Sequence, residues 1–418
     1  MAKRPSSLPF EVQARPGQPL GMAPRAFLRD YWHKRPLLVR GAFPGYVSPV
    51  EPEDLAGLAC EEGVLARLIQ HDRARDAWTV RSGPFPEELF PGLGDRDWTL
   101  LVQDMDKWDP DIAALLPAFN FLPRWRVDDV MVSFAATGGS VGAHVDHYDV
   151  FLLQAMGHRR WQIDASDAMG RGTPALDFRD DAEIKLLRDF SPTHDWVLEP
   201  GDMLYLPPLV PHHGVAEDPC LTFSLGMRAP SVAELMGDYV DTLAAEADEA
   251  LRYADPALEA AKDPWEIDAA AMARVVEALN AVRMADADAL GDWFGRFITV
   301  YRAAAGPGTG PGADRAEGGV PDPGQLGQAL DDGLVLARYP WTRVAWRRAA
   351  KGASLYVAGQ SWRLPVADAR RLAATDLLDA AAWNSLSAAG RDCVAGLMAE
   401  GHYRLEDTDT RDPDDRGD

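Results

Sequence analysis

The segment that decides the fold reads GGSVGAHVDHYDVFLLQAMGHRRWQI and covers residues 138–163. It begins with closely spaced glycines and a polar stretch, and two short runs containing apolar residues follow, at 149–157 and 159–165. Short runs of this kind, bounded by glycine and aspartate, are typical of β-strands. The segment therefore predicts two strands that follow a polar turn.

The same pattern extends along the chain in both directions. Further strands are predicted at 127–135, 195–208 and 221–228, with turns at 138–139, 200–202 and 207–208. Because no helices alternate with these strands, they favour an antiparallel double-sheet barrel of the jelly-roll or cupin kind. We therefore predict an α+β protein whose residues 21–230 form a double-stranded β-helix.

The regions outside the predicted strands differ in composition. Residues 1–20 are rich in Pro and Gly and predict a flexible arm, and residues 51–70 predict two short helices. Residues 231–305 are rich in Ala, Leu, Glu and Asp and predict helices. Apolar residues in MARVVEALNAVRM recur at a spacing of three and four, which predicts a buried stripe that faces either this chain or a second copy of it.

The C-terminal third begins with the strongest linker signal in the chain. Eleven of the nineteen residues at 306–324 are Gly or Pro. Residues 325–405 predict helices, a hairpin at 354–365 with its turn at Gly359, and a final strand, an arrangement similar to a winged-helix module. The tail, 406–418, has almost no apolar residues and is predicted to be disordered.

The charge and the cysteines restrict the classes of function. The 418 residues include 65 Asp and Glu against 42 Lys and Arg, a formal charge of −23, which argues against direct nucleic-acid binding. Such a surface is compatible with a basic protein partner or with solvation alone. No stretch approaches the roughly 18 apolar residues of a membrane helix, and no secretory signal is evident at the N-terminus. Three widely spaced cysteines form neither a disulfide framework nor a zinc ligand set, so we predict a cytoplasmic protein with no membrane association.

The chemistry is carried by the polar part of the opening segment. His144 and Asp146 are two residues apart, so on an extended backbone they point to one face and can bind one metal ion. A third ligand is available in LPPLVPHHG, at His212 or His213. Two histidines and one carboxylate form the facial triad of non-haem Fe(II) oxygenases, which leaves positions open for a cosubstrate and dioxygen.

The spacing alone does not single out this pair. His147 and Asp149 repeat the His-x-Asp pattern and would face the other way, and the glycines before His144 give the first pair only a modest preference. By itself the pattern is more often that of polar surface residues at the start of a strand.

A basic residue follows at a suitable distance. An oxygenase that uses 2-oxoglutarate must hold the far carboxylate of this cosubstrate. The guanidinium of an arginine can bind it with two parallel hydrogen bonds. Arg159 and Arg160 are the candidates, and because neighbouring strand residues alternate faces, at most one of them points inward.

With these motifs in order, the chain closely resembles the JmjC-type ribosomal oxygenases of the cupin superfamily. It is most similar to the bacterial branch that hydroxylates an arginine of a large-subunit ribosomal protein. The resemblance is strong over residues 25–230 and looser beyond them. It is carried by YWHKRPLLVRGAF, SGPFPEELF, WTLLVQDMDKW, WRVDDVMVSFA, the opening segment, LEPGDMLYLPPLVPHHG and FSLGMRAP.

The resemblance implies a role for particular residues. It implies His144, Asp146 and His212 as the ligands of Fe(II), although relatives often carry another residue where this chain has His213. It implies Arg159 as the anchor of 2-oxoglutarate. More weakly, it implies Ser133 near the cosubstrate, and Ser224 and either Asp128 or Asp129 near the substrate.

The resemblance also implies a layout and an activity. Residues 231–305 would form a helical dimerisation region and residues 325–405 a winged helix with a structural or docking role. The activity would be Fe(II)-, 2-oxoglutarate- and dioxygen-dependent hydroxylation of an arginine in a basic ribosomal protein, by a homodimer. Two alternatives remain open: the same chemistry on a histidine or a methylated lysine, or a cupin-like binding protein without enzyme activity.

Overall fold

The computed structural model describes residues 8–172, 176–258, 265, 267–282, 284, 287–300 and 320–407. The chain divides into two compact units, with the division in the main chain between Ala229 and Pro230. Residues 1–7 of the predicted arm, 306–319 of the predicted linker and 408–418 of the predicted tail lie outside the described residues.

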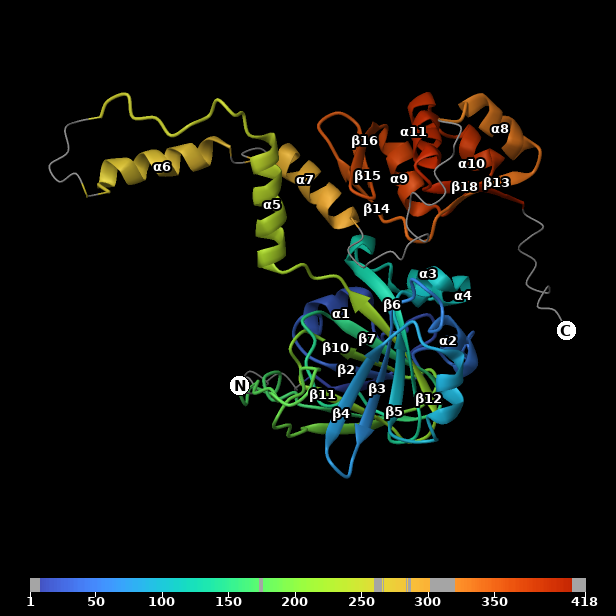
Figure 1. Cartoon of the computed structure of the whole chain (residues 1–418). Helices are drawn as coiled ribbons and strands as arrows, with labels where there is room; N and C mark the ends of the chain where they lie inside the picture. The colour runs from blue at the N-terminus through green and yellow to red at the C-terminus, as the bar shows by residue number, and fades with distance from the viewer. Residues whose placement is uncertain are drawn as a thin grey trace, which may run out of the picture. The chain divides into compact units, whose positions relative to one another are not determined.

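The first unit is built on two β-sheets, and Figure 1 labels most of their strands. The larger sheet has nine strands, in the spatial order β1 (Glu11–Gln13), β2 (Leu37–Arg40), β10 (Met203–Leu206), β7 (Val150–Met156), β12 (Cys220–Met227), β6 (Val127–Ala135), β5 (Trp98–Val102), β3 (Ala66–Asp72) and β4 (Ala77–Ser82). The smaller sheet has three, in the order β11 (His212–Ala216), β8 (Arg159–Ile163) and β9 (His194–Leu198). The double-stranded β-helix predicted from the sequence is confirmed.

The two sheets face each other across a shared apolar layer. Leu152 and Leu204 of the large sheet belong to one buried cluster with Trp161, Ile163 and Leu198 of the small sheet. The opposite face of the large sheet packs on the main core, to which short helices contribute, including α1 (Pro24–Asp30), α2 (Pro52–Leu58), α3 (Met105–Trp108) and α4 (Pro110–Ala113). Because β7 and β12 are covered on both faces, they are continuous buried runs.

Successive side chains of the central strand β12 point alternately into the main core and into the space between the sheets. Phe223 and Leu225 point into the main core, whereas Thr222 and Ser224, on the alternate face, point into the space between the sheets. The space between the sheets is therefore lined by small polar side chains at its centre.

Two predictions for the first unit differ from the structure. Residues 51–70 contain only one helix, α2, because their second half forms β3 between β4 and β5. Residues 11–13 of the predicted flexible arm are also ordered, as β1 pairs with β2 in parallel.

The second unit contains three helices and a small mixed module. The helices are α5 (Val232–Glu246), α6 (Ala269–Ala281) and α7 (Ala287–Thr299). The module contains α8 (Pro323–Asp331), β13 (Leu334–Arg338), β14 (Val344–Arg348), β15 (Ala353–Val357), β16 (Gln360–Leu364), α9 (Val366–Ala374), β17 (Leu377–Leu378), α10 (Ala380–Asn384), α11 (Ala388–Ala399) and β18 (Tyr403–Asp407). The hairpin β15–β16 turns at Gly359, as expected.

Helix α7 packs on the sheet formed by β14, β15 and β16, although it lies within the predicted dimerisation region. The Asp292 carboxylate accepts hydrogen bonds from Tyr356 at 2.5 Å and from Ser354 at 3.2 Å. The domain boundaries themselves stay predictions. Across the described part of the chain, the helices are too short or too polar to cross a membrane.

Candidate active site

Three predicted metal ligands come together at one end of the space between the sheets. One ligand atom from each of His144, Asp146 and His212 lies within 4.8 Å of the other two. His144 Nε2 is 3.9 Å from Asp146 Oδ1, and His212 Nε2 is 3.6 Å from Asp146 Oδ2. Two imidazoles and a carboxylate at this spacing fit a divalent transition metal with open coordination positions.

Backbone hydrogen bonds hold His144 and His212 opposite each other. His144 N–H donates to His212 C=O and His212 N–H donates to His144 C=O, both at 3.0 Å, so the pair forms a β-bridge. The chain reaches this bridge through the turn at Gly138-Gly139. A Cβ on Gly139 would lie 2.2 Å from the Trp98 carbonyl oxygen, so only glycine fits this turn.

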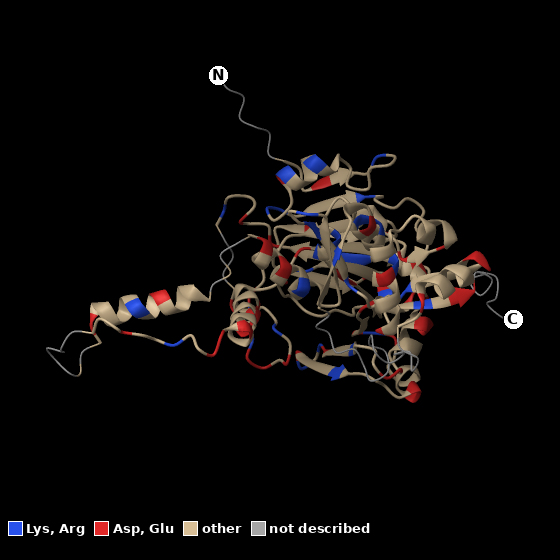
Figure 2. Ribbon diagram, turned by 90° about the horizontal axis from the view of Figure 1, so that it is seen from above, with Lys and Arg blue, Asp and Glu red and all other residues tan. Residues whose placement is uncertain are grey.

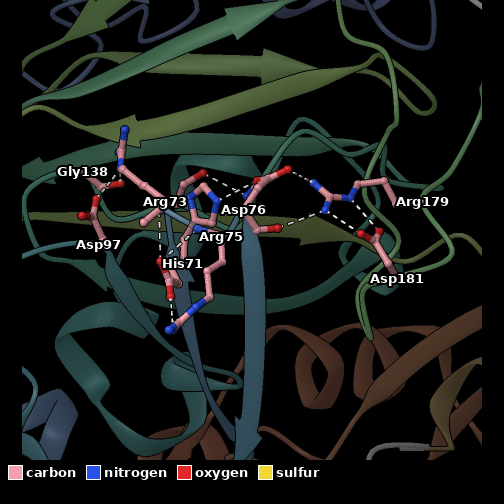
Figure 3. Close-up of polar contacts among 12 residues, drawn as sticks. His71, Arg73, Arg75, Asp76, Asp97, Gly138, Arg179 and Asp181 are labelled. Carbon is pink, nitrogen blue, oxygen red and sulfur yellow. Dashed lines mark hydrogen bonds and ion pairs between the residues drawn. The ribbon is translucent and has the colours of Figure 1, made fainter.

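A polar network steadies the turn and a neighbouring loop, as Figure 3 shows. Arg73, from the β3–β4 turn, donates to Asp97 Oδ1 at 2.6 Å and to the Gly138 carbonyl at 2.9 Å. Asp76, from the same turn, pairs with Arg179 at 2.7 Å. The Arg179 loop is in turn bound to the ligand segment, because Leu187 N–H donates to the Ala143 carbonyl at 2.8 Å.

The ring tautomers suit metal binding. His144 Nδ1–H donates to the Gly142 carbonyl at 3.0 Å and His212 Nδ1–H donates to the Val210 carbonyl at 2.9 Å, which leaves both Nε2 atoms as lone-pair donors. Burial, and then the neighbouring His144, lower the pKa of His212 to about 4. His212 is therefore neutral at pH 7, the form that binds metals.

The structure separates the alternatives that the sequence left open. His213 points away from the triad and contacts Phe190, with ring centroids 6.2 Å apart. His147 is exposed. Asp149 is buried elsewhere, where it accepts a hydrogen bond from Tyr205 at 2.6 Å and lies 3.0 Å from His33 Nε2. Of the two His-x-Asp pairs, only the first contributes to the triad.

Arg159 lies between the sheets with its charge uncompensated. Its side chain donates to Ser133 Oγ at 3.3 Å and Thr222 Oγ1 at 3.4 Å, and stacks over Trp161 at 5.0 Å. Its Nε has no hydrogen-bond partner among the described residues. Burial lowers the pKa of Arg159, but a guanidinium stays protonated. A buried cation with an unsatisfied donor fits the far carboxylate of 2-oxoglutarate. Arg160, by contrast, forms surface ion pairs with Glu217 and Asp195.

The other predicted residues lie along one face of β6 and β12. Ser133 is paired with Thr222, and two residues farther along, Met131 is paired with Ser224. Asp129 follows on the same face, whereas Asp128 is exposed on the opposite one. The face therefore runs from Arg159 through Ser224 to a carboxylate at Asp129.

Asp129 belongs to a cluster of acidic residues around one lysine. Its Oδ2 accepts a hydrogen bond from the Asp104 N–H at 3.1 Å. Lys107 Nζ donates to Asp104 at 2.9 Å and to Asp106 at 3.1 Å, and all three of these side chains are at most 8% exposed. Burial, and then the Asp104 carboxylate, raise the pKa of Asp129 to about 7. The cluster thus places three acidic side chains around one lysine.

Sequence reasoning missed several residues of this site. Thr222 and Gln154 complete the surroundings of Arg159, since Thr222 Oγ1 donates to Gln154 Oε1 at 3.1 Å. Lys107 and Asp104 were not recognised as neighbours of Asp129. The alternation of β12 was a signal for Thr222, because it shares the parity of Ser224.

A facial triad, a buried unpaired arginine and a double-stranded β-helix together define a 2-oxoglutarate-dependent oxygenase of the JmjC type. In agreement, residues 114–235 match the JmjC domain family and residues 282–404 match the ROXA-like winged helix. The chain is 35% identical over 319 residues to the ribosomal protein uL16 3-hydroxylase of Escherichia coli, covering 76% of this chain and 80% of the relative. The chain therefore belongs to the ribosomal oxygenase family.

Further relatives agree with this assignment. A probable ribosomal oxygenase of Haemophilus influenzae is 43% identical over 220 residues, and this match spans 52% of each chain. The X-ray structure of E. coli YcfD superposes with a TM-score of 0.80 at 31% identity, covering 93% of this chain and 99% of that one. A second YcfD structure, with a TM-score of 0.77, is a complex with cobalt and 2-oxoglutarate. The resemblance predicted from the sequence is confirmed.

Proposed function

We propose that this protein is an Fe(II)- and 2-oxoglutarate-dependent hydroxylase that acts on an arginine side chain of a large-subunit ribosomal protein. The observation that carries the proposal is the triad together with the buried Arg159, which lies beside Ser133 and Thr222 between the two sheets. Asp129 lies on the same face of β6 as Ser133. The names of the E. coli relatives support a ribosomal substrate and the cosubstrate.

Each group on this face has a separate task. His144, Asp146 and His212 would hold the iron, which supplies oxidation of an unactivated C–H bond by dioxygen when it is bound. Arg159, supported by Ser133, would bind the far carboxylate of 2-oxoglutarate and fix its orientation. The apolar residues around the space, such as Trp161 and Leu152, exclude water from it.

The arginine specificity rests on the opposite end of the face. A substrate guanidinium that enters there would meet the Asp129 carboxylate, which a planar cation can bind with two hydrogen bonds. Ser224, halfway between Asp129 and Arg159, offers a further acceptor for the substrate. A neutral side chain would leave the acidic cluster uncompensated, and this disfavours it.

The charge of the whole chain supports a basic partner. Figure 2 shows Asp and Glu distributed over strands, helices and loops of the described chain, and the formal charge is −23. An acidic surface of this kind favours encounter with a basic ribosomal protein and disfavours direct contact with RNA. Such an enzyme would meet its substrate in the cytoplasm.

We also propose that the protein is a homodimer. Val232, Met236 and Val240 follow one face of α5 and are 50–75% exposed. Helix α6 carries a second stripe, in which Met272, Val275, Val276 and Leu279 are 37–68% exposed. Amphipathic helices with exposed apolar stripes are typical of an interface, and a second copy of the chain would cover both stripes.

The hydroxylation is tested by mass spectrometry. The protein is incubated with Fe(II), 2-oxoglutarate, dioxygen and ribosomal proteins from cells that lack it, with His144→Ala as the inactive control. We expect one large-subunit protein to gain one oxygen atom on an arginine. Oxygen on a histidine, or loss of a methyl group, would support the alternative substrates instead, and no mass change on any ribosomal protein would refute the proposal.

A further inference from the structure

The turn that leads into the third metal ligand contains an unusual residue. Pro208 and Leu209 form this turn, and Leu209 has φ of +64°. Proline followed by a residue at positive φ is the arrangement of a type II turn, whose second central position strongly favours glycine. A leucine at this position strains the backbone, because its Cβ approaches the following carbonyl oxygen.

Leu209 stands out among the residues with this conformation. Six non-glycine residues in the described ranges have positive φ: His33, Asp76, Asp97, Asp104, Leu209 and Ala358. Aspartate and histidine are enriched in this region of conformational space, and Ala358 is small, whereas a bulky aliphatic residue is an outlier. A residue of this kind is retained where the surrounding structure or a function requires it.

The Leu209 side chain belongs to none of the apolar clusters of the described residues. The side chain is 45% exposed to solvent, so it contributes little to any apolar core. The backbone is what fixes the turn, since Leu209 N–H donates to the Asp146 carbonyl at 2.7 Å, and glycine would make the same bond. Leucine therefore combines backbone strain with apolar exposure, and neither stabilises the free protein.

The position of Leu209 suggests what offsets these costs. The Leu209 N–H donates a hydrogen bond to the carbonyl of Asp146, one of the predicted metal ligands. Leu209 also lies three residues before His212, another of these ligands. Tyr148, two residues after Asp146, is also large and is 42% exposed. Two partly exposed side chains with apolar surface thus belong to the segments that carry the triad, to which the target residue must be delivered.

We propose that Leu209 is a specificity-determining residue that binds an apolar side chain of the substrate polypeptide close to the hydroxylated residue. This inference rests on the proposed function, because it requires a protein substrate. The Leu209 side chain then becomes buried only in the enzyme–substrate complex.

The proposal makes opposite predictions for stability and for substrate binding. Leu209→Gly should raise Tm by about 2–4 °C, because it removes the strain. The same variant should raise KM for a peptide of the hydroxylated ribosomal protein about fivefold to tenfold, because it removes apolar contact area. Leu209→Met keeps both the strain and the apolar surface, so its Tm and KM should stay near those of the unmodified protein.

A second set of variants locates the contact. Replacing each apolar residue of the peptide by alanine should identify one whose loss raises KM for the unmodified enzyme but not for Leu209→Gly, since coupled positions are not additive. Val47→Ala, at a side chain that is 82% exposed on the loop after β2, is the control and should leave KM unchanged. Cobalt affinity, followed by absorbance, should be equal in Leu209→Gly and the unmodified protein.

The outcomes separate this inference from the function on which it rests. If the unmodified enzyme hydroxylates the peptide but Leu209→Gly has an unchanged KM, the inference is wrong and the function stands. A lower Tm for Leu209→Gly would show that the side chain is structural, which also overturns the inference. If the unmodified enzyme hydroxylates no ribosomal peptide, both fail together.

Discussion

At the scale of single residues, Asp129 carries a charge that the fold disfavours. Burial and the Asp104 carboxylate raise its pKa to about 7, so its ionised form is less stable in the folded chain than in the unfolded one. A carboxylate of this kind destabilises the apoprotein and becomes favourable when a cation approaches it. This property suits the proposed recognition of a substrate guanidinium.

This predicts how stability changes with pH when the charge is removed. The ionised Asp129 lowers the free energy of unfolding, and this loss is fully present above pH 7. It is absent below about pH 4, where Asp129 is protonated in both the folded and the unfolded chain. Asp129→Asn should therefore raise Tm at pH 8 and leave it unchanged near pH 4, as measured by thermal melts across the range. Asp128→Asn, on the exposed face, is the matched control, and an equal gain there would contradict the assignment.

The residues of the site were predictable to different degrees. His144, Asp146 and His212 belong to ordered motifs, so the sequence indicated them before any geometry was known. The neighbours of Asp129 were not predictable, because Asp104 is 25 residues away in the chain and reaches it only through a left-handed backbone conformation at that residue.

At the scale of elements, β11 shows how a strand leaves space for Arg159, the proposed anchor of the cosubstrate. Gly214 shares the inward face of β11 with His212. A Cβ at this position would lie 2.7 Å from the Trp161 ring and 2.9 Å from Arg159 Nε. The missing side chain is therefore what lets the guanidinium occupy its place between the sheets.

Gly214→Ala should consequently weaken cosubstrate binding more than metal binding. Displacing Arg159 should raise KM for 2-oxoglutarate by about tenfold or more, while cobalt affinity stays close to that of the unmodified protein. Succinate formation measures the first quantity and absorbance titration the second. Gly237→Ala, on α5 with open space around it, is the control. An unchanged KM for 2-oxoglutarate in Gly214→Ala would contradict this account of the strand.

The strands were predicted well where their burial pattern is unambiguous and poorly elsewhere. The run VDDVMVSFA was expected as a strand at 127–135 and coincides with β6. Residues 63–70, GVLARLIQ, lie in the second half of the stretch 51–70, for which two short helices were expected. Their apolar residues at 64, 65, 68 and 69 also fit a helical spacing. Pairing with β4 and β5 decides the outcome, and a single sequence does not show that pairing.

At the scale of the whole molecule, α5 and α6 expose apolar stripes that the proposed dimer would cover. Neither helix contains a buried residue among those described, although both are amphipathic. Apolar stripes exposed on two successive helices favour aggregation of a monomer, whereas an oligomer buries them in its interface.

Breaking the α6 stripe should therefore break the proposed dimer. The double variant Val276→Glu and Leu279→Glu should sediment as a monomer, because it places two charges in the apolar contact. Glu277→Gln, on the same helix, should leave the mass of the assembly unchanged. A monomeric unmodified protein in analytical ultracentrifugation would refute the dimer proposal without affecting the proposed chemistry.

The central place of β12 also determines when this protein can fold. This strand pairs with β6 on one side and β7 on the other, and it ends at Met227, after every other strand of the first unit has been synthesised. As the chain leaves the ribosome, the edges of β6 and β7 that pair with β12 therefore stay unpaired until β12 emerges. Strands that wait in this way are open to pairing with other chains, so the nascent polypeptide depends on protection, such as chaperones provide, until β12 closes the sheet.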